Sequence, residues 1–402
     1  MEKATIVLVG SLDTKGEVYQ FVHDRIEAQG LNALYVDTSV FEHEKIKPDI
    51  SAAEVAAAGG TDLSVLREKK DRGFAMKVMS EGAAVIAKKL YEEGKLHGIF
   101  GMGGGGGTTV GSTAMRALPI GIPKLLVSTV ASSDVSNYVQ ETDITMMPSI
   151  VDVDGINRFS AMILGNASAA ICGMVAQEKV KYDETRPMIG ATMFGVTTPC
   201  VTRAKEALEK QGYEVLVFHA VGSGGKTLEK LIREGYIAGV LDLTTTELAD
   251  ELAGGWLSAG PERLDAAAAK GIPQVVSCGA LDMVNFGPMD SVPEKYKDRK
   301  LVPHNPLNTL MRTTPEENKK LGEIIAGKLN KSTGKTWFLI PKKGFSMMDN
   351  EGGAFYDPDA DKAFIEGLKA TAAGNFEIIE IDANINDPVF ADTAAKILIE
   401  NL

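Results

Sequence analysis

The sequence predicts an α/β protein built from two Rossmann-like, doubly wound parallel-sheet domains that face a central cleft. Short apolar runs with strand character alternate with segments of helical periodicity, which is typical of βαβ units and a parallel sheet. The same alternation starts again at Met188, after a charged segment at residues 179–187. We therefore expect one domain over residues 1–182 and a second over residues 183–402.

The elements of the first half follow from local patterns. Ile6–Gly10 is a short apolar run, and the apolar residues after it recur at i, i+3, i+4 and i+8, as on one face of a helix (Val18, Phe21, Val22 and Ile26). A second helical pattern ends near Tyr91. Further strands are expected at Leu34–Asp37, Gly98–Gly101 and Lys124–Val130.

The second half repeats this order. Strands are expected at Met188–Gly195, Glu214–Ala220, Ile237–Leu243 and Gln274–Ala280, with later strands at Trp337–Ile340 and Phe376–Asp382 and a closing helix from Asp392. Three short segments of the first half match segments of the second half in the same order: residues 29–37 with 211–219, 98–101 with 238–242, and 121–128 with 271–277. This order supports two related halves.

Composition excludes several classes of protein. A hydrophobic content of 44% supplies enough apolar material for packed cores, which argues against a disordered chain. A net charge of −12 repels phosphate backbones, so we expect no nucleic-acid partner. Three separated cysteines exclude a disulfide scaffold and fit a reducing cytoplasm, and the histidines show no metal-ligand spacing.

One uncharged stretch, Phe159–Gln177, is long enough to suggest a membrane helix. Its apolar residues are mostly Ala, Gly and Met and are interrupted by Ser and Asn, which favours a buried helix of a soluble protein. We expect no membrane association and a cytoplasmic protein. We also expect a homodimer, with this helix buried inside the subunit or at its interface.

The strongest local signal is a glycine run after the predicted strand Gly98–Gly101. It contains Gly103, Gly104, Gly105, Gly106 and Gly107, which we call the glycine loop, followed by Thr108 and Thr109. Glycine lets backbone N–H groups approach a phosphate closely, and the threonines offer hydroxyl groups. The acidic residue that accompanies GxGxxG in NAD sites is missing about 20 positions later. The run therefore predicts phosphate binding and disfavours NAD, while a flexible loop is the alternative.

Two other loops offer weaker anion sites. Asp13, Thr14 and Lys15 follow the first predicted strand, where the start of a helix with a lysine could hold an anion or could be an ordinary capped helix. Ala220–Thr227 ends like a Walker A loop, but Ala220 replaces the first glycine of that motif. A true nucleotide-binding P-loop is therefore disfavoured at this position.

Several motifs resemble the ATP-binding family typified by the tomato mosaic virus resistance protein. They are GSLDTKGE, GMGGGGGTT, LPIGIPKLLVSTVAS, PSIVDVDGIN, DLTTTELADEL, MRTTPEEN and INDPVFAD, and they cover nearly the whole chain. The resemblance implies two Rossmann-like domains with ATP, and Mg²⁺ as a candidate companion, in the first. The nucleotide would meet Asp13, Thr14, Lys15, Thr38, Arg72, the glycine loop and Thr108. Some relatives carry a further TIM-barrel domain, which we do not expect here.

Polar residues in the second half suggest a second ligand. His304, Asn305 and Arg312 lie in a stretch that reads as a Pro-rich loop before a helix, and they could orient an anionic substrate across the cleft. Alternatively, Arg312 pairs with Glu316 one helical turn on. Two functions stay open: an ATP-dependent transferase, ligase or hydrolase acting on a small anionic molecule, and a non-catalytic module whose closure on ATP controls a protein partner.

Overall fold

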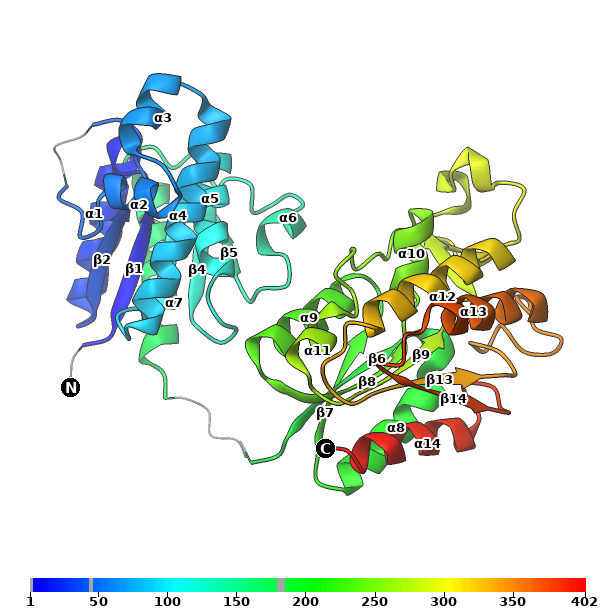
Figure 1. The fold of residues 1–402 in the computed structure, drawn as a ribbon. Coiled ribbons are helices and arrows are strands. Elements are labelled where there is room, and N and C mark those ends of the chain that lie inside the picture. The colour runs from blue at the N-terminus through cyan, green and yellow to red at the C-terminus, as the bar shows by residue number, and fades with distance from the viewer. Residues whose placement is uncertain (1–2, 43–45, 179–184) are drawn as a thin grey trace. The chain divides into compact units, whose positions relative to one another are not determined.

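A computed structural model describes residues 3–42, 46–178 and 185–402. The chain divides into two compact units, Met1–Lys181 and Tyr182–Leu402. Each unit is a parallel β-sheet flanked by helices on both faces (Figure 1), as the alternating pattern of the sequence predicts.

The sheet of the N-terminal unit has five parallel strands in the order β2-β1-β3-β4-β5. The strands are β1 (Thr5–Gly10), β2 (Asn32–Asp37), β3 (Gly98–Gly103), β4 (Lys124–Ser128) and β5 (Thr145–Pro148). The helices are α1 (Leu12–Ala28), α2 (Ala52–Ala58), α3 (Leu63–Lys69), α4 (Arg72–Glu92), α5 (Gly105–Arg116), α6 (Ser136–Val139) and α7 (Arg158–Ala176).

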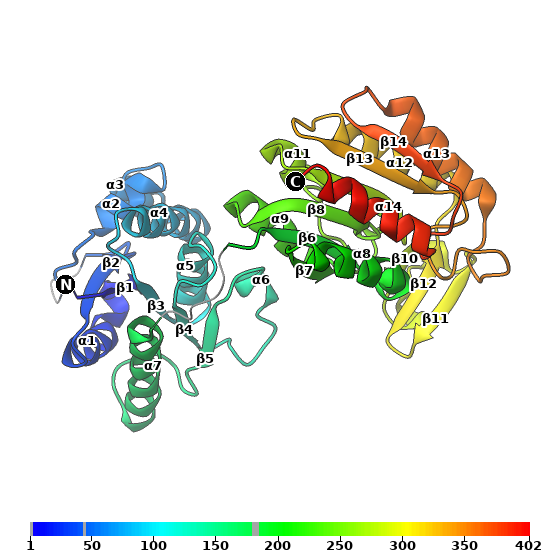
Figure 2. The same cartoon turned by 90° about the horizontal axis from the view of Figure 1, so that it is seen from below.

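Successive side chains of β1 point to opposite faces of the sheet, and each face has its own hydrophobic core. Val7 and Val9 pack with residues of α2, α4 and α5, whereas Ile6 and Leu8 pack with residues of α1 and α7 on the opposite face. Figure 2 shows α1 and α7 on one side of the strands and α2 and α4 on the other. The two helices that follow β1 and β3, α1 and α5, therefore lie on opposite faces of the sheet.

The C-terminal unit has a six-stranded parallel sheet in the order β14-β13-β9-β8-β6-β7. Its strands are β6 (Met188–Met193), β7 (Glu214–His219), β8 (Ile237–Thr244), β9 (Gln274–Gly279), β13 (Thr336–Pro341) and β14 (Glu377–Ile381). A separate antiparallel sheet consists of β10 (Met283–Phe286), β11 (Leu301–Asn305) and β12 (Asn308–Arg312). The α/β pattern does not predict this small sheet.

Helices cover both faces of the larger sheet (Figure 1). Those on one face are α8 (Thr198–Lys210) and α14 (Pro388–Ile399), and those on the other are α9 (Ser223–Glu234), α10 (Glu247–Ala253), α11 (Asp265–Lys270), α12 (Pro315–Leu329) and α13 (Pro358–Thr371). Short 3₁₀ turns lie at Gly195–Thr197 (η1), Met289–Ser291 (η2) and Glu294–Tyr296 (η3).

Helix α7 contains the stretch that the sequence marks as apolar. Length and composition alone would let it cross a membrane, and it is the one such helix among the described residues. Leu164, Ala167 and Ile171 are fully or almost fully buried against the core of the N-terminal unit. The helix therefore has the packing of a core helix on this face, while Phe159 and Met162 are exposed on the other.

Candidate functional site

The N-terminal unit has its topological switch point between β1 and β3. Strand β1 pairs with β2 on one side and with β3 on the other, and the helices after β1 and β3 leave toward opposite faces. Ligands of doubly wound sheets bind at the carboxyl ends of the strands on either side of such a point. The segment after β1 and the glycine loop after β3 both lie at this edge.

Tyr19 fixes the carboxyl ends of these two strands. Its buried hydroxyl donates to the Val9 carbonyl oxygen at 2.6 Å and accepts from the Met102 N–H at 3.1 Å, so it joins β1 to β3. The ring occupies the space beside Gly10, where a Cβ would lie 2.0 Å from the tyrosine oxygen. Burial, the largest cause, raises the pKa of Tyr19 well above its ordinary value, so the phenol stays protonated.

Two residues of the glycine loop are glycine for structural reasons. Gly103 has a φ of +148°, a backbone conformation that other residues rarely adopt. A Cβ on Gly107 would lie 2.6 Å from the Met102 carbonyl oxygen. Both glycines let α5 start close against the end of β3.

The other three glycines of the loop have no such reason. A Cβ on Gly105 would meet no atom within 4 Å, and one on Gly104 or Gly106 would meet its nearest side-chain atom at 3.7 Å. Glycine in a helix costs about 0.5–1 kcal/mol relative to alanine. The space beside Gly105 is therefore open to a ligand that approaches the backbone, and Gly104 and Gly106 could each carry a Cβ in ordinary van der Waals contact.

The start of α5 also offers unpaired donors. Gly105, Gly106 and Gly107 are its first three residues, whose N–H groups have no intrahelical acceptor, and no side chain caps this end. The helix macrodipole adds a partial positive charge here. Donors and partial charge of this kind are the features by which helix starts can bind phosphate.

Thr108 has a different place from the one the sequence suggests. It is fully buried, and its hydroxyl donates to the Gly104 carbonyl oxygen at 2.8 Å and lies 2.6 Å from the Ser128 hydroxyl. Thr108 therefore holds the glycine loop against the end of β4 and does not present a free hydroxyl. These contacts argue against direct contact of the Thr108 hydroxyl with a nucleotide, which stays a prediction.

The start of α1, in contrast, is closed to an anion. The N–H groups of Leu12, Asp13 and Thr14 bond to the side chains of Asp37, Ser39 and Asp13, at 3.3, 2.9 and 2.7 Å. Because two of these acceptors are carboxylates, this end of the helix already holds negative charge. These bonds argue against a backbone anion site at Asp13 and Thr14, which stays a prediction.

Thr38 lies beside this capped end. It is buried, its N–H donates to the Gly10 carbonyl oxygen at 3.0 Å, and its hydroxyl is 3.4 Å from that of Ser11. These contacts tie the segment after β2 to the end of β1. Thr38 thus takes part in shaping the switch-point edge.

Two cations face no acidic partner at this edge. In residues 3–42, 46–178 and 185–402, neither the half-buried Lys15 nor the exposed Arg72 forms an ion pair. Arg72 is the first residue of α4, one turn before Met76, whose sulfur lies 3.7 Å from the Cβ position of Gly106. Since residues four apart share a helix face, Arg72 lies on the face of α4 that adjoins the glycine loop.

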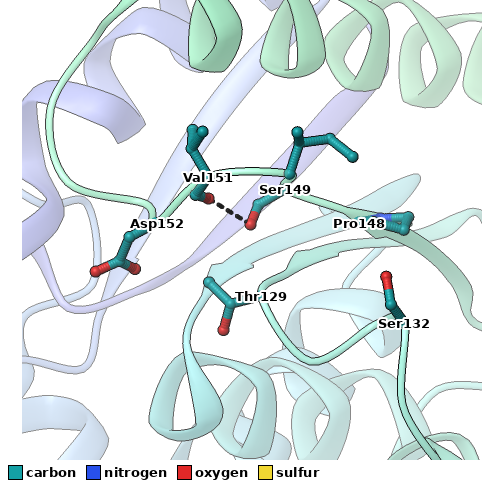
Figure 3. Close-up of a pocket in the computed structure, with 7 residues that line it drawn as sticks. Thr129, Ser132, Pro148, Ser149, Val151 and Asp152 are labelled. Atoms are coloured by element: carbon teal, nitrogen blue, oxygen red, sulfur yellow. Dashed lines mark hydrogen bonds between the residues drawn. The ribbon is translucent and has the colours of Figure 1, made fainter.

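A pocket of about 520 Å³ adjoins the glycine loop on the β4 side. Figure 3 shows it between the segment after β4, with Thr129 and Ser132, and the segment Pro148–Asp152, which begins at the last residue of β5. The Thr129 hydroxyl lies 3.7 Å from the Cβ position of Gly104, and the Thr129 N–H donates to the Gly103 carbonyl oxygen at 3.1 Å. Thr129 therefore belongs to both the pocket and the border of the glycine loop.

Ile150, on the pocket wall, has a strained backbone. Its φ is +67°, and the Val151 N–H donates to the Ser149 carbonyl oxygen at 2.7 Å, which closes a rare γ-turn. The Ser149 hydroxyl donates to the Val151 carbonyl oxygen at 2.6 Å and secures the turn. A β-branched residue in this conformation costs about 1–3 kcal/mol, and such strain is concentrated at functional sites.

The Walker-like loop of the C-terminal unit holds an anion of its own. The Glu247 carboxylate accepts from the N–H groups of Gly222 and Gly225 at 2.7 and 3.0 Å, at the start of α9. It also pairs with the fully buried Arg263 at 2.7 Å, which in turn binds Asp242. An internal carboxylate therefore occupies the position that a phosphate takes in a P-loop.

The three residues proposed for catalysis are not brought together. Asn305 pairs with Asn308 at the turn between β11 and β12, and its side chain accepts from the Leu307 N–H at 2.8 Å; the adjacent His304 is exposed. Arg312 is four residues from Asn308 along β12, or about 13 Å at about 3.3 Å per residue. These residues lie on strands and not in the expected loop.

Arg312 has a structural environment. It is 4% exposed, and its guanidinium contacts Asp361 at 3.0 Å, Asp349 at 3.4 Å and the Phe355 carbonyl oxygen at 2.7 Å. Its partners are not Glu316, the alternative that the sequence suggested. The guanidinium is therefore engaged inside the C-terminal unit and is not free to clamp a substrate.

Burial raises carboxyl pKa values around this arginine. The pKa of Asp282 rises to about 7 and that of Asp361 to about 8, in both cases mainly through burial and then through the neighbouring Asp349. One oxygen of Asp282 has no hydrogen-bond partner among the residues that the structure describes. The cluster therefore holds protons near neutral pH.

No group of three or more His, Cys, Asp or Glu side chains is arranged to hold a metal ion within residues 3–42, 46–178 and 185–402. A Mg²⁺ ion that accompanies a nucleotide is held mostly by phosphate oxygens and water, with only one or two carboxylates. Such an ion would accordingly depend on the bound phosphates.

Comparison with known proteins places the chain in one family. Residues 4–180 and 186–402 match the N-terminal and C-terminal domains of the Uncharacterised protein family (UPF0261). A UPF0261 protein of Clostridium tetani is 53% identical over 98% of both chains, and one of Rhizobium meliloti is 46% identical over 97% of both.

The ToMV resistance protein Tm-1(GCR237) of Solanum lycopersicum is 44% identical over 98% of this chain, which spans 55% of that protein. Among solved structures, a UDP-N-acetylglucosamine 2-epimerase from Rickettsia bellii aligns over 99% of this chain and 96% of its own, with 10% identity and a TM-score of 0.24.

Proposed function

This chain belongs to the UPF0261 family, and we propose that its N-terminal unit binds ATP, with the phosphates on the N–H groups of the glycine loop. The observation that carries the proposal is the start of α5, which no side chain caps and where the space beside Gly105 is open. The choice of ATP as the ligand is our inference from the resemblance of the glycine-loop motif to ATP-binding proteins.

Lys15 and Arg72 complete the proposed site. A triphosphate carries several negative charges, and these two cations, which form no ion pair within the described residues, would neutralise part of them. In this proposal Tyr19 and Thr108 position the backbone without touching the ligand. Asp13, Thr14 and Thr38 shape the adjoining edge through their bonds at the start of α1.

The pocket beside the glycine loop favours an ATP-dependent enzyme over a non-catalytic module, because a second reactant there would lie next to the phosphates. In this proposal, both the ATP and the second reactant bind to the N-terminal unit. Arg312 contributes through the stability of the C-terminal unit.

Calorimetric titration of the full chain with ATP tests the proposal. We expect saturable binding, weakened about tenfold or more by Lys15→Ala and by Arg72→Ala, since each loses a charge-assisted contact. Lys88→Ala is the matched control, because Lys88 is exposed on α4, 16 residues beyond Arg72 or about 24 Å along the helix. Absence of ATP binding by the unaltered chain would disprove the proposal.

A further inference from the structure

The pocket beside the glycine loop is lined by a negative charge, whereas the start of α5 carries a partial positive charge. Seven residues line it: Thr129, Ser132, Pro148, Ser149, Ile150, Val151 and Asp152. The single charge among them is the negative one of Asp152, whereas the glycine loop offers N–H donors and lies near two cations. A phosphate or carboxylate in the pocket would meet a carboxylate and no cation.

Hydroxyl groups on the pocket wall are available to a ligand. Thr129 and Ser132 are exposed, and within the described ranges 3–42, 46–178 and 185–402 neither hydroxyl has a hydrogen-bond partner. Asp152 is exposed, and one of its oxygens accepts from the Val153 N–H at 2.8 Å, which leaves the second oxygen as an acceptor. This set can both donate to and accept from hydroxyl groups of a ligand.

An apolar surface lies beside these polar groups. Ile150 is 70% exposed, and the γ-turn described above, which Ser149 secures, holds it in the left-handed conformation. Pro148 and Val151 add apolar atoms to the same wall. Sugars and polyols present C–H groups alternating with hydroxyl groups, and such molecules match a wall of this composition. A volume of about 520 Å³ is within the range of small-molecule sites.

We propose that this pocket binds a small, uncharged, hydroxyl-rich molecule, a polyol or a sugar, as the second ligand of the N-terminal unit. Asp152 and the hydroxyls of Thr129 and Ser132 bind its hydroxyl groups, and Ile150 covers its C–H surface. Its position next to ATP rests on the proposed function, whereas binding to the pocket does not. The inference replaces the small anionic substrate that the sequence suggested.

Paired probes of equal carbon number test the inference. Ribitol and D-glucose are the uncharged probes, and ribonate and D-gluconate are their acids, each titrated calorimetrically into the full chain with and without ATP. We expect at least one uncharged probe to bind, with its acid at least tenfold weaker. Asp152→Ala and Thr129→Val should each weaken that binding at least tenfold, and Asp152→Ala should keep the unaltered chain's ATP affinity within about twofold.

Asp154→Ala is the matched control, because Asp154 is exposed two residues from Asp152 and does not line the pocket. It should leave binding of the uncharged probe unchanged. The inference is overturned if neither uncharged probe binds, if the acids bind as tightly, or if the two pocket variants bind like the control. Loss of ATP binding alone would remove the proposed function and leave the pocket assignment standing.

Discussion

Replacing Gly105 with alanine should stabilise the protein and weaken ATP binding at the same time. Gly105 is exposed at the start of α5, and a Cβ there would meet no atom within 4 Å. Gly→Ala at a compatible helical position stabilises by about 0.5–1 kcal/mol. That gain corresponds to a melting temperature higher by about 1–4 °C for a unit of this size.

The same methyl group would stand where the phosphate approaches. Cα–Cβ bonds of a helix tilt toward its N-terminus, so the methyl of Gly105→Ala would project toward the anion site. Loss of one hydrogen bond to a charged group costs about 1.5–3 kcal/mol, or about 10- to 150-fold in Kd. Stability and affinity should therefore change in opposite directions.

Scanning calorimetry and titration calorimetry on the same samples measure both effects. Gly173→Ala in α7 is the control, because Gly173 is also exposed and its Cβ would also meet no atom within 4 Å. It should raise the melting temperature similarly and leave the Kd for ATP unchanged. A Gly105→Ala protein with the unaltered Kd would refute the assignment of the phosphate site.

Other predictions concern the rest of the chain. Lys226→Ala should leave the Kd for ATP unchanged in the same titration, because the Walker-like loop already holds a carboxylate; a large loss would contradict this. Arg312→Met should lower the unfolding free energy of the C-terminal unit by about 3–5 kcal/mol in urea denaturation, because it leaves buried carboxylates without their cation; near-unaltered stability would contradict the ion-pair account. The pKa values of Asp282 and Asp361 are raised to about 7 and about 8, so the folded state binds protons that the unfolded chain releases. The melting temperature should therefore fall as the pH rises from about 5 to about 8. A melting temperature that rises across this range would contradict the raised pKa values. We also predict a homodimer whose interface includes the exposed Phe159 of α7. In light scattering, Phe159→Glu should convert this dimer to a monomer. An unaltered chain that is monomeric at micromolar concentration would exclude the dimer.

The sequence predicts the fold class and the position of the glycine loop between a strand and a helix, because both depend on local pattern. The predicted strand Ile6–Gly10 corresponds to β1 and Gln274–Ala280 to β9, each within one residue at its ends. A run of glycines between an apolar strand and a helix places backbone N–H donors at the start of that helix. The small antiparallel sheet was missed because Pro303 and Pro306 in the β11–β12 hairpin resemble a loop.

The state of individual polar groups depended on distant residues. Thr108 looked free because Ser128, its partner, comes 20 residues later on β4. Arg312 could be matched in the sequence only with a neighbour, whereas its partner Asp361 comes 49 residues later. Tyr19, which joins β1 to β3, occupies an ordinary apolar position of a helix face and gave no signal of its contact.

The Walker-like loop illustrates the same limit. Its glycines and Lys226 predict an open anion site, but the anion comes from Glu247 on α10, 25 residues after Gly222. The two glycine-rich helix starts of the chain look alike in sequence. They differ because the fold places the Glu247 carboxylate at the start of α9, whereas no side chain caps the start of α5.

A crystal structure of the full chain with bound ATP tests the central claim most directly. The account predicts phosphate oxygens within about 3.2 Å of the backbone nitrogens of at least two of Gly105, Gly106 and Gly107. It predicts none at the nitrogens of Leu12–Thr14, which side chains already cap. Phosphates bound at the start of α1 or α9, with the start of α5 left without a phosphate, would contradict it.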